Sequence, residues 1–395
     1  MDKIEEVLSR GVEKIYPSKE ALEKVLRSGK KIRLYQGFDP SMPNLHLGNM
    51  VGVLKLKQFQ DLGHKVIFLV GDFTGMIGDP TDKTSLRPQL TRKQVLENCK
   101  NWKEQASRVL NFNGKNPAQF LYNSQWLSKI SFTELLNLGR HLTYQQTIKR
   151  EMFRKRLKQD KDIYLHEFLY PLMQGYDSVH LNVDLEIGGS DQMFNMLVGR
   201  DLMKKLKNKE KFVLTTKLLV DSKGEKVGKT TGNALFLNAS PNEMYGGIMS
   251  FPDEVIPLSF ELLTLLPLQS IKSLGKELNP MDLKKKLAFE IVKMYYSEKD
   301  AENAEKYFKE VFQKGQLPGE NITVYQIKPA EKQDIIKILT ESGLVSSHGE
   351  AKRLIAQGGV DVDGKTIKEI SEVKLEDGSI IKAGKKKFLK IKIEK

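Results

Sequence analysis

The start of one predicted helix has residues with phosphate-binding chemistry. The segment His46–Asn49 follows a Pro/Asn turn and opens a run whose apolar residues keep helical spacing. Free N–H groups and the dipole at a helix start favour phosphate, and an imidazole there can donate a hydrogen bond as charge develops on the phosphate oxygens. A single His-x-Gly sequence is also common as simple helix-start punctuation, so it needs partners elsewhere in the chain.

A second group of candidate phosphate ligands lies far downstream. The segment Lys226–Thr230 is rich in Gly and Lys, and as a loop it could move two ammonium groups onto a leaving pyrophosphate. An exposed basic turn would have the same composition. The two segments together therefore carry more weight than either alone.

Three polar residues share one face of another predicted helix. Tyr170, Gln174 and Asp177 are spaced i, i+4 and i+7, and apolar residues surround them. A polar stripe on a solvated helix would lack this apolar surround. We expect these three side chains to converge on one ligand.

The elements that must position these residues follow a strand, helix, strand order. Residues 32–38 and 65–70 read as buried strands, with the His46 helix between them. This order predicts a parallel sheet with ligands at the carboxyl ends of its strands. The first strand is not followed by Gly-x-Gly-x-x-Gly, and the sequence has no P-loop pattern, which argues against dinucleotide oxidoreductases and P-loop NTPases.

The length and net charge of the chain limit the classes of protein to which it can belong. The chain has 395 residues, with 64 Lys and Arg against 50 Asp and Glu, and a formal net charge of +14. This length predicts two or three folding units, and the charge favours a polyanionic partner such as nucleic acid. The one cysteine, Cys99, excludes an internal disulfide, and Cys and His spacing suggests no zinc site. Without an apolar signal core or membrane span, we expect a cytoplasmic protein.

The two phosphate-binding segments resemble the HIGH and KMSKS signatures of class I aminoacyl-tRNA synthetases. From about residue 35 to 233 the sequence resembles the tyrosyl-tRNA synthetase family of bacterial type. Five blocks carry this resemblance ahead of the lysine loop: residues 35–40, 46–49, 75–80, 170–177 and 187–192. The chain departs from the signatures where Asn49 replaces the last His, Val227-Gly228 replaces Met-Ser, and Thr230 replaces the last Ser.

The resemblance implies an α/β protein of three parts. Residues 1–230 would form the Rossmann-like parallel-sheet catalytic domain with both signature motifs, residues 231–328 a mainly helical domain and linker, and residues 329–395 a small α+β domain. This last part resembles an RNA-binding module of a ribosomal small-subunit protein. Its Lys352 and Arg353 would bind tRNA phosphates. Basic runs at 149–161 and 204–211 could meet the acceptor stem.

The resemblance also implies a role for each residue that matches a family motif. For tyrosine, the residues are Tyr35 and Asp177 at the phenol, Asp79, Tyr170 and Gln174 at the ammonium, and Gln192 near the carboxyl group. For ATP, they are Asp39, Ser41, His46, Gly48, Asn49, Gly188, Gly189, Asp191, Leu219, Val220, Lys226 and Lys229. For catalysis, they are His46, Lys83, Arg87, Lys226, Lys229 and Thr230.

The implied reaction has two steps at one site. L-tyrosine and ATP would form tyrosyl-adenylate and pyrophosphate, and the tyrosyl group would then pass to the 3′-terminal adenosine of tRNA(Tyr) with release of AMP. Mg²⁺ would accompany ATP without dedicated protein ligands, and no tightly bound cofactor is expected. The resemblance further implies a homodimer.

Three alternatives stay open on the sequence. A tryptophanyl-tRNA synthetase has a similar catalytic fold, but Tyr35 and Asp177 favour a phenol. An RNA-binding protein without activity would not need His46 or the signature lysines. A nucleotidyltransferase with a His-x-Gly helix start would need neither the tyrosine-like pocket nor the tail.

Overall fold

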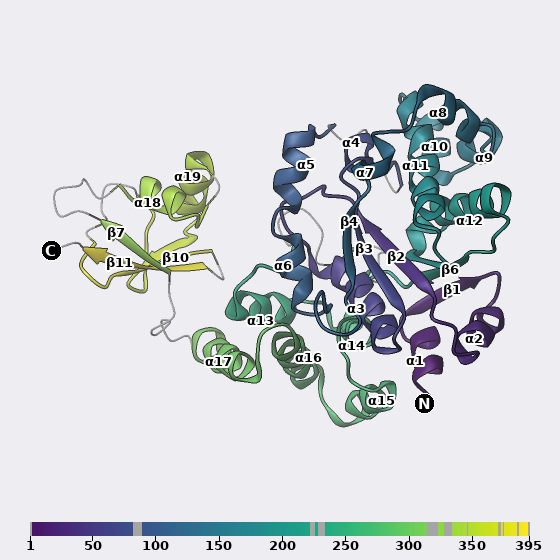
Figure 1. The fold of residues 1–395 in the computed structure, drawn as a ribbon. Helices are drawn as coiled ribbons and strands as arrows, with labels where there is room; N and C mark the ends of the chain where they lie inside the picture. The colour runs from purple at the N-terminus through teal and green to yellow at the C-terminus, as the bar shows by residue number, and fades with distance from the viewer. Residues whose placement is uncertain are drawn as a thin grey trace. The chain divides into compact units, whose positions relative to one another are not determined.

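A computed structural model of the chain describes residues 2–81, 89–221, 226–227, 234–313, 323–327, 334–345, 347–369, 373, 375–384 and 387–393 (Figure 1). Contacts divide the chain into two compact units, residues 1–301 and 302–395. The three-part division at residues 230 and 328 stays a prediction.

A six-stranded sheet forms the centre of the first unit, with the order β1-β6-β5-β2-β3-β4. All neighbouring strands run parallel except β1, which is antiparallel to β6. In β3 the residues 66–70 are all buried and apolar, as expected where both faces of a parallel sheet are covered. The predicted α/β parallel-sheet fold is confirmed. The strands are β1 (Val12–Tyr16), β2 (Arg33–Phe38), β3 (Lys65–Val70), β4 (Gln119–Tyr122), β5 (Leu185–Gly189) and β6 (Phe212–Thr216).

The connection from β2 to β3 contains α3 (Leu47–Asp61), which is buried along most of its length. His46 is its N-cap residue. In a parallel strand-helix-strand unit, the helix begins at the carboxyl end of the first strand. The fold therefore brings the start of α3 to the same edge of the sheet as the ends of β2, β3 and β5.

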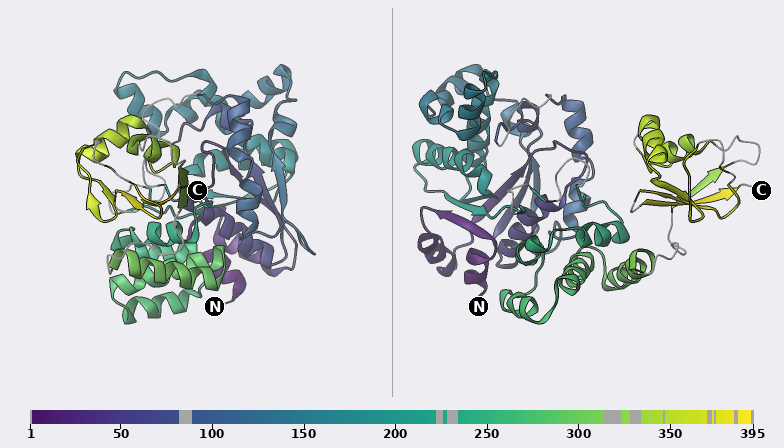
Figure 2. Two further views of the ribbon diagram at one scale, coloured as in Figure 1. Left: turned by 90° about the vertical axis from the view of Figure 1, so that its left-hand side faces the viewer. Right: turned by 180° about the vertical axis from the view of Figure 1, so that it is seen from behind.

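Two further groups of helices lie beside the sheet in the first unit. Helices α13 (Pro241–Met249), α14 (Ile256–Leu263), α15 (Leu268–Glu277) and α16 (Pro280–Tyr295), coloured green, form one group in all three views (Figures 1 and 2). A second, teal group contains α8 (Phe132–Gly139), α9 (Tyr144–Ile148), α10 (Glu151–Lys158), α11 (Leu165–Leu181) and α12 (Met193–Lys207). Among the described residues, no helix has both the length and the apolar character needed to cross a membrane.

The shorter helices complete the first unit. They are α1 (Lys3–Ser9), α2 (Lys19–Arg27), α4 (Thr74–Ile77), α5 (Arg92–Cys99), α6 (Trp102–Ser107) and α7 (Ser124–Leu127), with 3₁₀ turns at Ser190–Gln192 and Asp253–Val255. Helix α17 (Glu298–Phe308) and the π turn Lys309–Gln313 follow α16.

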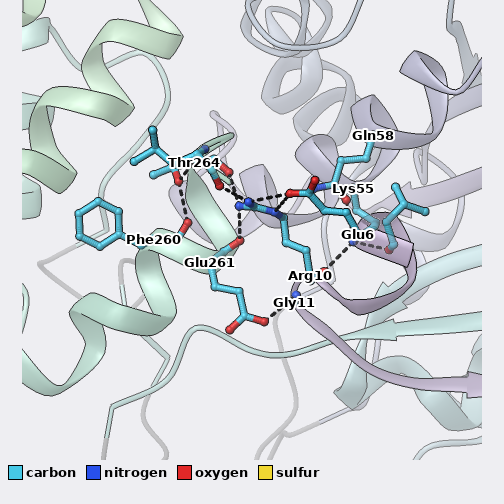
Figure 3. A network of polar contacts seen from close by, with 10 residues as sticks. Glu6, Arg10, Gly11, Lys55, Gln58, Phe260, Glu261 and Thr264 are labelled. Carbon is cyan, nitrogen blue, oxygen red and sulfur yellow. Dashed lines mark hydrogen bonds and ion pairs between the residues drawn. The ribbon is translucent and has the colours of Figure 1, made fainter. Parts of the chain in front are cut away.

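A buried polar network connects α1 to the green helices (Figure 3). The Arg10 guanidinium donates to the carbonyl oxygens of Glu261 at 3.3 Å and Thr264 at 3.0 Å, and its charge is paired with Glu6 at 2.9 Å. It also donates to the carbonyl oxygen of Leu266. Because Arg10 is only 3% exposed, this network ties the N-terminal helix to α14 inside the unit.

Lys55 of α3 belongs to the same network (Figure 3). Its ammonium donates to the carbonyl oxygens of Val7 at 2.9 Å and Arg10 at 2.7 Å, and to Gln58 Oε1 at 2.7 Å. These two carbonyls lie at the end of α1, where helical carbonyls have no partner within the helix. Lys55 thus joins the end of α1 to the buried helix that begins at His46.

The second unit is a small α+β fold, as predicted for the tail. Its sheet has the order β7-β11-β10-β8-β9, and α18 and α19 pack on a core that includes Ile335, Leu339, Ile355, Ile381 and Leu389. An Asp363-Gly364 hairpin turn joins β8 and β9, and both residues have positive φ, as a type I′ turn requires. The elements are β7 (Thr323–Ile327), α18 (Ile335–Glu341), α19 (His348–Ala356), β8 (Val360–Val362), β9 (Lys365–Thr366), β10 (Ile380–Ala383) and β11 (Lys387–Ile393).

Candidate active site

A cavity of about 1230 Å³ lies at the carboxyl ends of the central strands. The segments that follow β2, β3, β5 and β6 all contribute to its lining. Within the described part of the first unit, every residue that the sequence assigned to tyrosine or ATP lines this cavity. They are Tyr35, Asp39, Ser41, His46, Gly48, Asn49, Asp79, Tyr170, Gln174, Asp177, Gly188, Gly189, Asp191, Gln192, Leu219, Val220 and Lys226.

The other assigned residues lie elsewhere. Lys83, Arg87, Lys229 and Thr230 lie outside the described residues. Lys352 and Arg353 are exposed on α19 in the second unit, as their proposed contact with tRNA requires.

Asp177 is held in the cavity wall by two side chains that the sequence did not single out. Trp126 Nε1 donates to its Oδ1 at 2.7 Å, and Asn123 Nδ2 donates to its Oδ2 at 3.2 Å. Burial raises the pKa of the Asp177 carboxyl well above its ordinary value, and these two hydrogen bonds oppose that rise. The carboxyl group is therefore fixed in place, so it is preorganised to accept a donor from a ligand.

Tyr35 lines the same cavity from β2 and is 1% exposed. Its hydroxyl is 2.9 Å from Ser178 Oγ and donates to the carbonyl oxygen of Gln174 at 3.4 Å. Burial, followed by the nearby carboxylates of Glu186 and Asp177, raises its pKa well above 10. Tyr35 therefore stays a neutral hydroxyl beside Asp177.

A chain of hydrogen bonds joins the nucleotide-side and amino-acid-side residues. Tyr170 donates from its hydroxyl to Asp39 Oδ2 at 2.8 Å, and Thr74 Oγ1 donates to Asp39 Oδ1 at 2.7 Å. Gly71, at the end of β3, leaves the space for this contact, because a Cβ atom there would lie 2.0 Å from Asp39 Oδ1. Thr74 and Gly71 line the cavity but had no recognisable sequence signal.

Asp79 is oriented by residues from both sides of the cavity. Its Oδ1 accepts from the Thr81 amide at 3.0 Å and hydroxyl at 2.7 Å, and its Oδ2 accepts from Gln192 Nε2 at 2.6 Å. Gln192 Oε1 in turn accepts from the buried Asn195 amide at 3.1 Å. This chain holds the Asp79 carboxylate and the Gln192 amide together, as the resemblance implied for neighbouring groups of one substrate.

The start of α3 is fixed by the segment that follows the lysine motif. His46 and Phe236 form an antiparallel β-bridge. Next to it, the backbone N–H of Leu47 donates to the carbonyl oxygen of Leu235 at 2.8 Å. Asn49 Oδ1 accepts from the His46 backbone N–H at 3.0 Å, so the residue that replaces the last His of the signature completes the helix cap. This pairing explains how two motifs far apart in sequence meet at one cavity.

Lys226 reaches the end of β5. Its ammonium pairs with Asp191 Oδ2 at 2.7 Å, and Val227 N donates to Leu219 O at 2.9 Å. Gly189 leaves the space for Asp191, because a Cβ atom there would lie 2.5 Å from Asp191 Oδ1. A lysine of the second signature and an acidic residue of the predicted ribose site are thus in direct contact.

Glu186 is a further cavity-lining carboxylate that sequence reasoning missed. It pairs with Lys211, which lies in the basic run 204–211 that was expected to face the acceptor stem. Lys211 is fully buried, so this expectation was wrong for that residue. The charge run resembles a solvated face in sequence, and only the packing of β5 against β6 reveals the pair.

Comparison with known proteins identifies relatives of both units. A family model described as tRNA synthetases class I (W and Y) matches residues 27–313, and an S4 domain model matches residues 335–377. A tyrosine–tRNA ligase of Carboxydothermus hydrogenoformans is 42% identical and covers 99% of this chain and 98% of its own length. One of Thermotoga maritima is 40% identical, covering 98% of this chain and 96% of its own length.

Solved structures with the same fold agree with these matches. A truncated mitochondrial tyrosyl-tRNA synthetase of Aspergillus nidulans superposes with a TM-score of 0.68 at 23% identity, covering 78% of this chain and 94% of its own. A tyrosyl-tRNA synthetase of Archaeoglobus fulgidus, solved with L-tyrosine, has a TM-score of 0.59 at 22% identity, covering 77% of this chain and all of its own.

Proposed function

We propose that this chain, which belongs to the tyrosine–tRNA ligase family of class I tRNA synthetases, activates tyrosine and charges tRNA at this cavity. In this proposal the cavity binds L-tyrosine and ATP and forms tyrosyl-adenylate with release of pyrophosphate. The same site then transfers the tyrosyl group to the 3′-terminal adenosine of tRNA(Tyr) and releases AMP.

One observation supports tyrosine as the amino acid more than any other. Asp177 and Tyr35 are both buried in the cavity wall, and Asp177 is held by Trp126 and Asn123. A substrate phenol can donate to the carboxyl group and accept from the Tyr35 hydroxyl, whose single proton then replaces its long 3.4 Å contact with the Gln174 carbonyl by a bond to the substrate. An indole offers no oxygen to accept from Tyr35, which disfavours the tryptophanyl alternative.

The other end of the amino acid would meet acceptors. Gln174 Oε1 is buried, lines the cavity and accepts no hydrogen bond from any described residue. Asp79 and the Tyr170 hydroxyl line the same cavity. An ammonium group has three N–H donors and no acceptor, so a set of oxygen acceptors is the complement it needs.

Activation needs positioning and charge stabilisation but no protein nucleophile. The tyrosine carboxylate would attack the α-phosphorus of ATP in line, with pyrophosphate leaving from the opposite side. We assign His46, at the start of α3, and Lys226 to the phosphates, and the Gly188-Gly189 backbone with Asp191 to the ribose. Lys83, Arg87 and Lys229 complete the proposed phosphate set, and Thr230 is a further proposed catalytic residue.

Mg²⁺ would accompany the ATP phosphates and neutralise part of their charge. Among the described residues no group of three or more His, Cys, Asp or Glu side chains could hold a metal ion. Mg²⁺ keeps several of its waters and binds mainly through substrate phosphates in such sites, so the cavity fits it without dedicated ligands.

The second unit would bind the tRNA. It matches the S4 domain model, and Lys352 and Arg353 are exposed on α19. Replacing both with alanine should weaken tRNA charging while leaving tyrosine-dependent ATP–pyrophosphate exchange unchanged, because phosphate contacts contribute to RNA affinity and not to activation. A double variant with normal charging kinetics would contradict this assignment.

We also propose a homodimer, with the interface on the teal helices. Phe132 in α8, Tyr144 in α9 and Leu165 at the start of α11 are 75%, 61% and 86% exposed, and α8 to α11 lie together in the first unit (Figure 1). Large apolar side chains exposed on one group of helices favour an interaction surface there. In sedimentation velocity the wild-type protein should sediment as a dimer and Leu165→Asp as a monomer. A wild-type protein that sediments as a monomer would contradict the proposal.

ATP–pyrophosphate exchange with each amino acid in turn tests the proposed reaction. Only tyrosine should support rapid exchange. His46→Ala should lower its rate by roughly 10²-fold, the scale of a lost donor to developing charge. Asp177→Ala should also lower it strongly. Exchange that depends on tryptophan, or on no amino acid, would overturn the proposal.

A further inference from the structure

A buried ion pair lies directly behind the amino-acid side of the cavity. The Lys211 ammonium contacts Glu186 Oε2, and the two side chains are 0% and 2% exposed. Glu186 belongs to β5, and Lys211 immediately precedes β6, the neighbouring parallel strand. The ammonium also donates to Ser178 Oγ at 2.9 Å and to the carbonyl oxygen of Met196 at 3.1 Å. All three of its N–H donors are therefore used inside the protein.

The packing of α11 on α12 leaves space for the ammonium. A Cβ atom at Gly199 of α12 would lie 2.7 Å from Lys211 Nζ and 3.1 Å from Ser178 Oγ. Because Gly199 has no side chain, Nζ can lie beside Ser178 of α11. The position of the charge is thus set by the helix crossing.

Glu186 connects the buried Lys211 ammonium to side chains that line the cavity. Its Oε1 accepts from Gln174 Nε2 at 3.0 Å, and its Oε2 accepts from Ser178 Oγ at 3.2 Å. Ser178 Oγ is also 2.9 Å from the Tyr35 hydroxyl. Two side chains assigned to the substrate, Gln174 and Tyr35, therefore connect to one buried carboxylate.

The contact with Glu186 determines which end of the Gln174 amide faces the ligand. An ionised carboxylate can only accept hydrogen bonds, whereas an amide has a donor end and an acceptor end. The NH₂ end must therefore point to Glu186, and Oε1 points away from it. Gln174 lines the cavity, and its Oε1 is buried and accepts no hydrogen bond from the described residues, so this oxygen is an acceptor available to a ligand.

We propose that Lys211 and Glu186 are positioning residues for recognition of the substrate ammonium. Lys211 fixes the Glu186 carboxylate by a direct ion pair, and Glu186 holds the Gln174 amide with its oxygen toward the ammonium. Without the lysine, the carboxylate loses the cation that fixes it, and the amide can then turn its NH₂ end to the ligand. This inference rests on the proposed function, in which Gln174 binds the ammonium.

Two variants and a matched control test the pair. Lys211→Met removes the charge, and the double variant K211M/E186Q removes both charges without leaving either unpaired. Lys55→Met changes a second buried lysine, whose hydrogen-bond partners do not line the cavity. The assay is tyrosine-dependent ATP–pyrophosphate exchange. Absence of this exchange in the wild-type protein would refute the proposed function. Where the wild type shows exchange, the variants test the role of the Lys211–Glu186 pair.

Both pocket variants should raise KM for tyrosine by about tenfold or more, the scale of a lost hydrogen bond to a charged group, with a smaller change in kcat. The double variant should regain most of the thermal stability lost in K211M, because it leaves no buried charge unpaired. It should keep the raised KM, because the amide introduced by E186Q can pair with Gln174 in either orientation. K55M should keep KM within about twofold. Recovery of KM together with stability, or an equal rise in K55M, would overturn the proposal.

A ligand without the ammonium separates positioning from general damage. The deaminated analogue 3-(4-hydroxyphenyl)propionate keeps the phenol and the carboxylate. Its inhibition constant in K211M/E186Q should stay within about twofold of the wild-type value, while KM for tyrosine rises about tenfold. Equal weakening of both ligands would show that the pair supports the whole pocket and not the ammonium site.

Discussion

Lys55 and Lys211 are both buried in the first unit, but their ammonium groups meet different partners. Lys55 is 4% exposed and donates to two carbonyl oxygens and the Gln58 side chain, whereas Lys211 is fully buried and pairs with the Glu186 carboxylate. Burial, and then the nearby Arg10 guanidinium, lower the pKa of Lys55 to about 7. Burial also lowers the pKa of Lys211, but Glu186 opposes that shift.

The difference separates a lysine that supports the fold from one that we assign to the site. Lys55 needs only oxygen acceptors, because its contacts tie the end of α1 to α3 (Figure 3). Lys211 pairs with a carboxylate, and in our proposal that carboxylate sets the direction of the Gln174 amide. The same residue type at the same burial therefore predicts different responses to substitution.

Removal of the Lys211 charge should have the largest effect on stability. Lys211→Met leaves a buried carboxylate without its cation, which costs about 3–5 kcal/mol in the free energy of unfolding. Urea unfolding followed by tryptophan fluorescence measures this, because both tryptophans, Trp102 and Trp126, lie in the first unit. A loss below about 1 kcal/mol would mean that the pair contributes little and would remove the contrast with Lys55.

Removal of the Lys55 charge should have a smaller effect. Lys55→Met leaves the carbonyls of Val7 and Arg10 without this donor but leaves no buried opposite charge unpaired. We therefore expect the free energy of unfolding to fall by about 2 kcal/mol. The same unfolding experiment gives the comparison. If K55M were more destabilising than K211M, the distinction drawn from their partners would be wrong.

At the cavity end of the Lys211 network, Tyr35→Phe should relax selection for tyrosine over phenylalanine by about tenfold, because one hydrogen bond to the substrate phenol is lost. The measurement is kcat/KM for both amino acids. Tyr295→Phe is the matched control: its hydroxyl donates to the Gln105 carbonyl at 2.8 Å, and the residue does not line the cavity. Unchanged selection in Tyr35→Phe, or an equal change in the control, would count against a phenol site at Tyr35.

The two lysines should also differ in how they make stability depend on pH. The unfolded chain keeps Lys55 protonated up to its ordinary pKa of 10.5, whereas the folded chain releases that proton above about pH 7. The unfolded state then binds more protons, so the free energy of unfolding should rise from about pH 7 to 10.5, by at most about 1.4 kcal/mol per pH unit. Subtracting the K55M profile from the wild type isolates this slope, since Lys211 is present in both. A difference that falls with pH would contradict it.

Short-range spacing determined what the sequence could predict. Three local features depend only on neighbouring residues, and the structure contains each of them. They are the helix start at His46, the helix face with Tyr170, Gln174 and Asp177, and the Asp363-Gly364 hairpin turn. The strand, helix, strand order predicted the parallel-sheet α/β unit, and the family resemblance implied the small α+β tail.

Only the tertiary structure decided which distant side chains hold the site. Asn123 and Trp126 contact Asp177 across more than 50 positions of sequence, and no local pattern links them. In the same way, Lys211 belongs to a basic run that predicts a solvated surface, and it is buried only because β6 packs beside β5 and Gly199 leaves room for its ammonium. Burial and pairing of a charge depend on which strands and helices become neighbours, and that arrangement is a property of the whole fold.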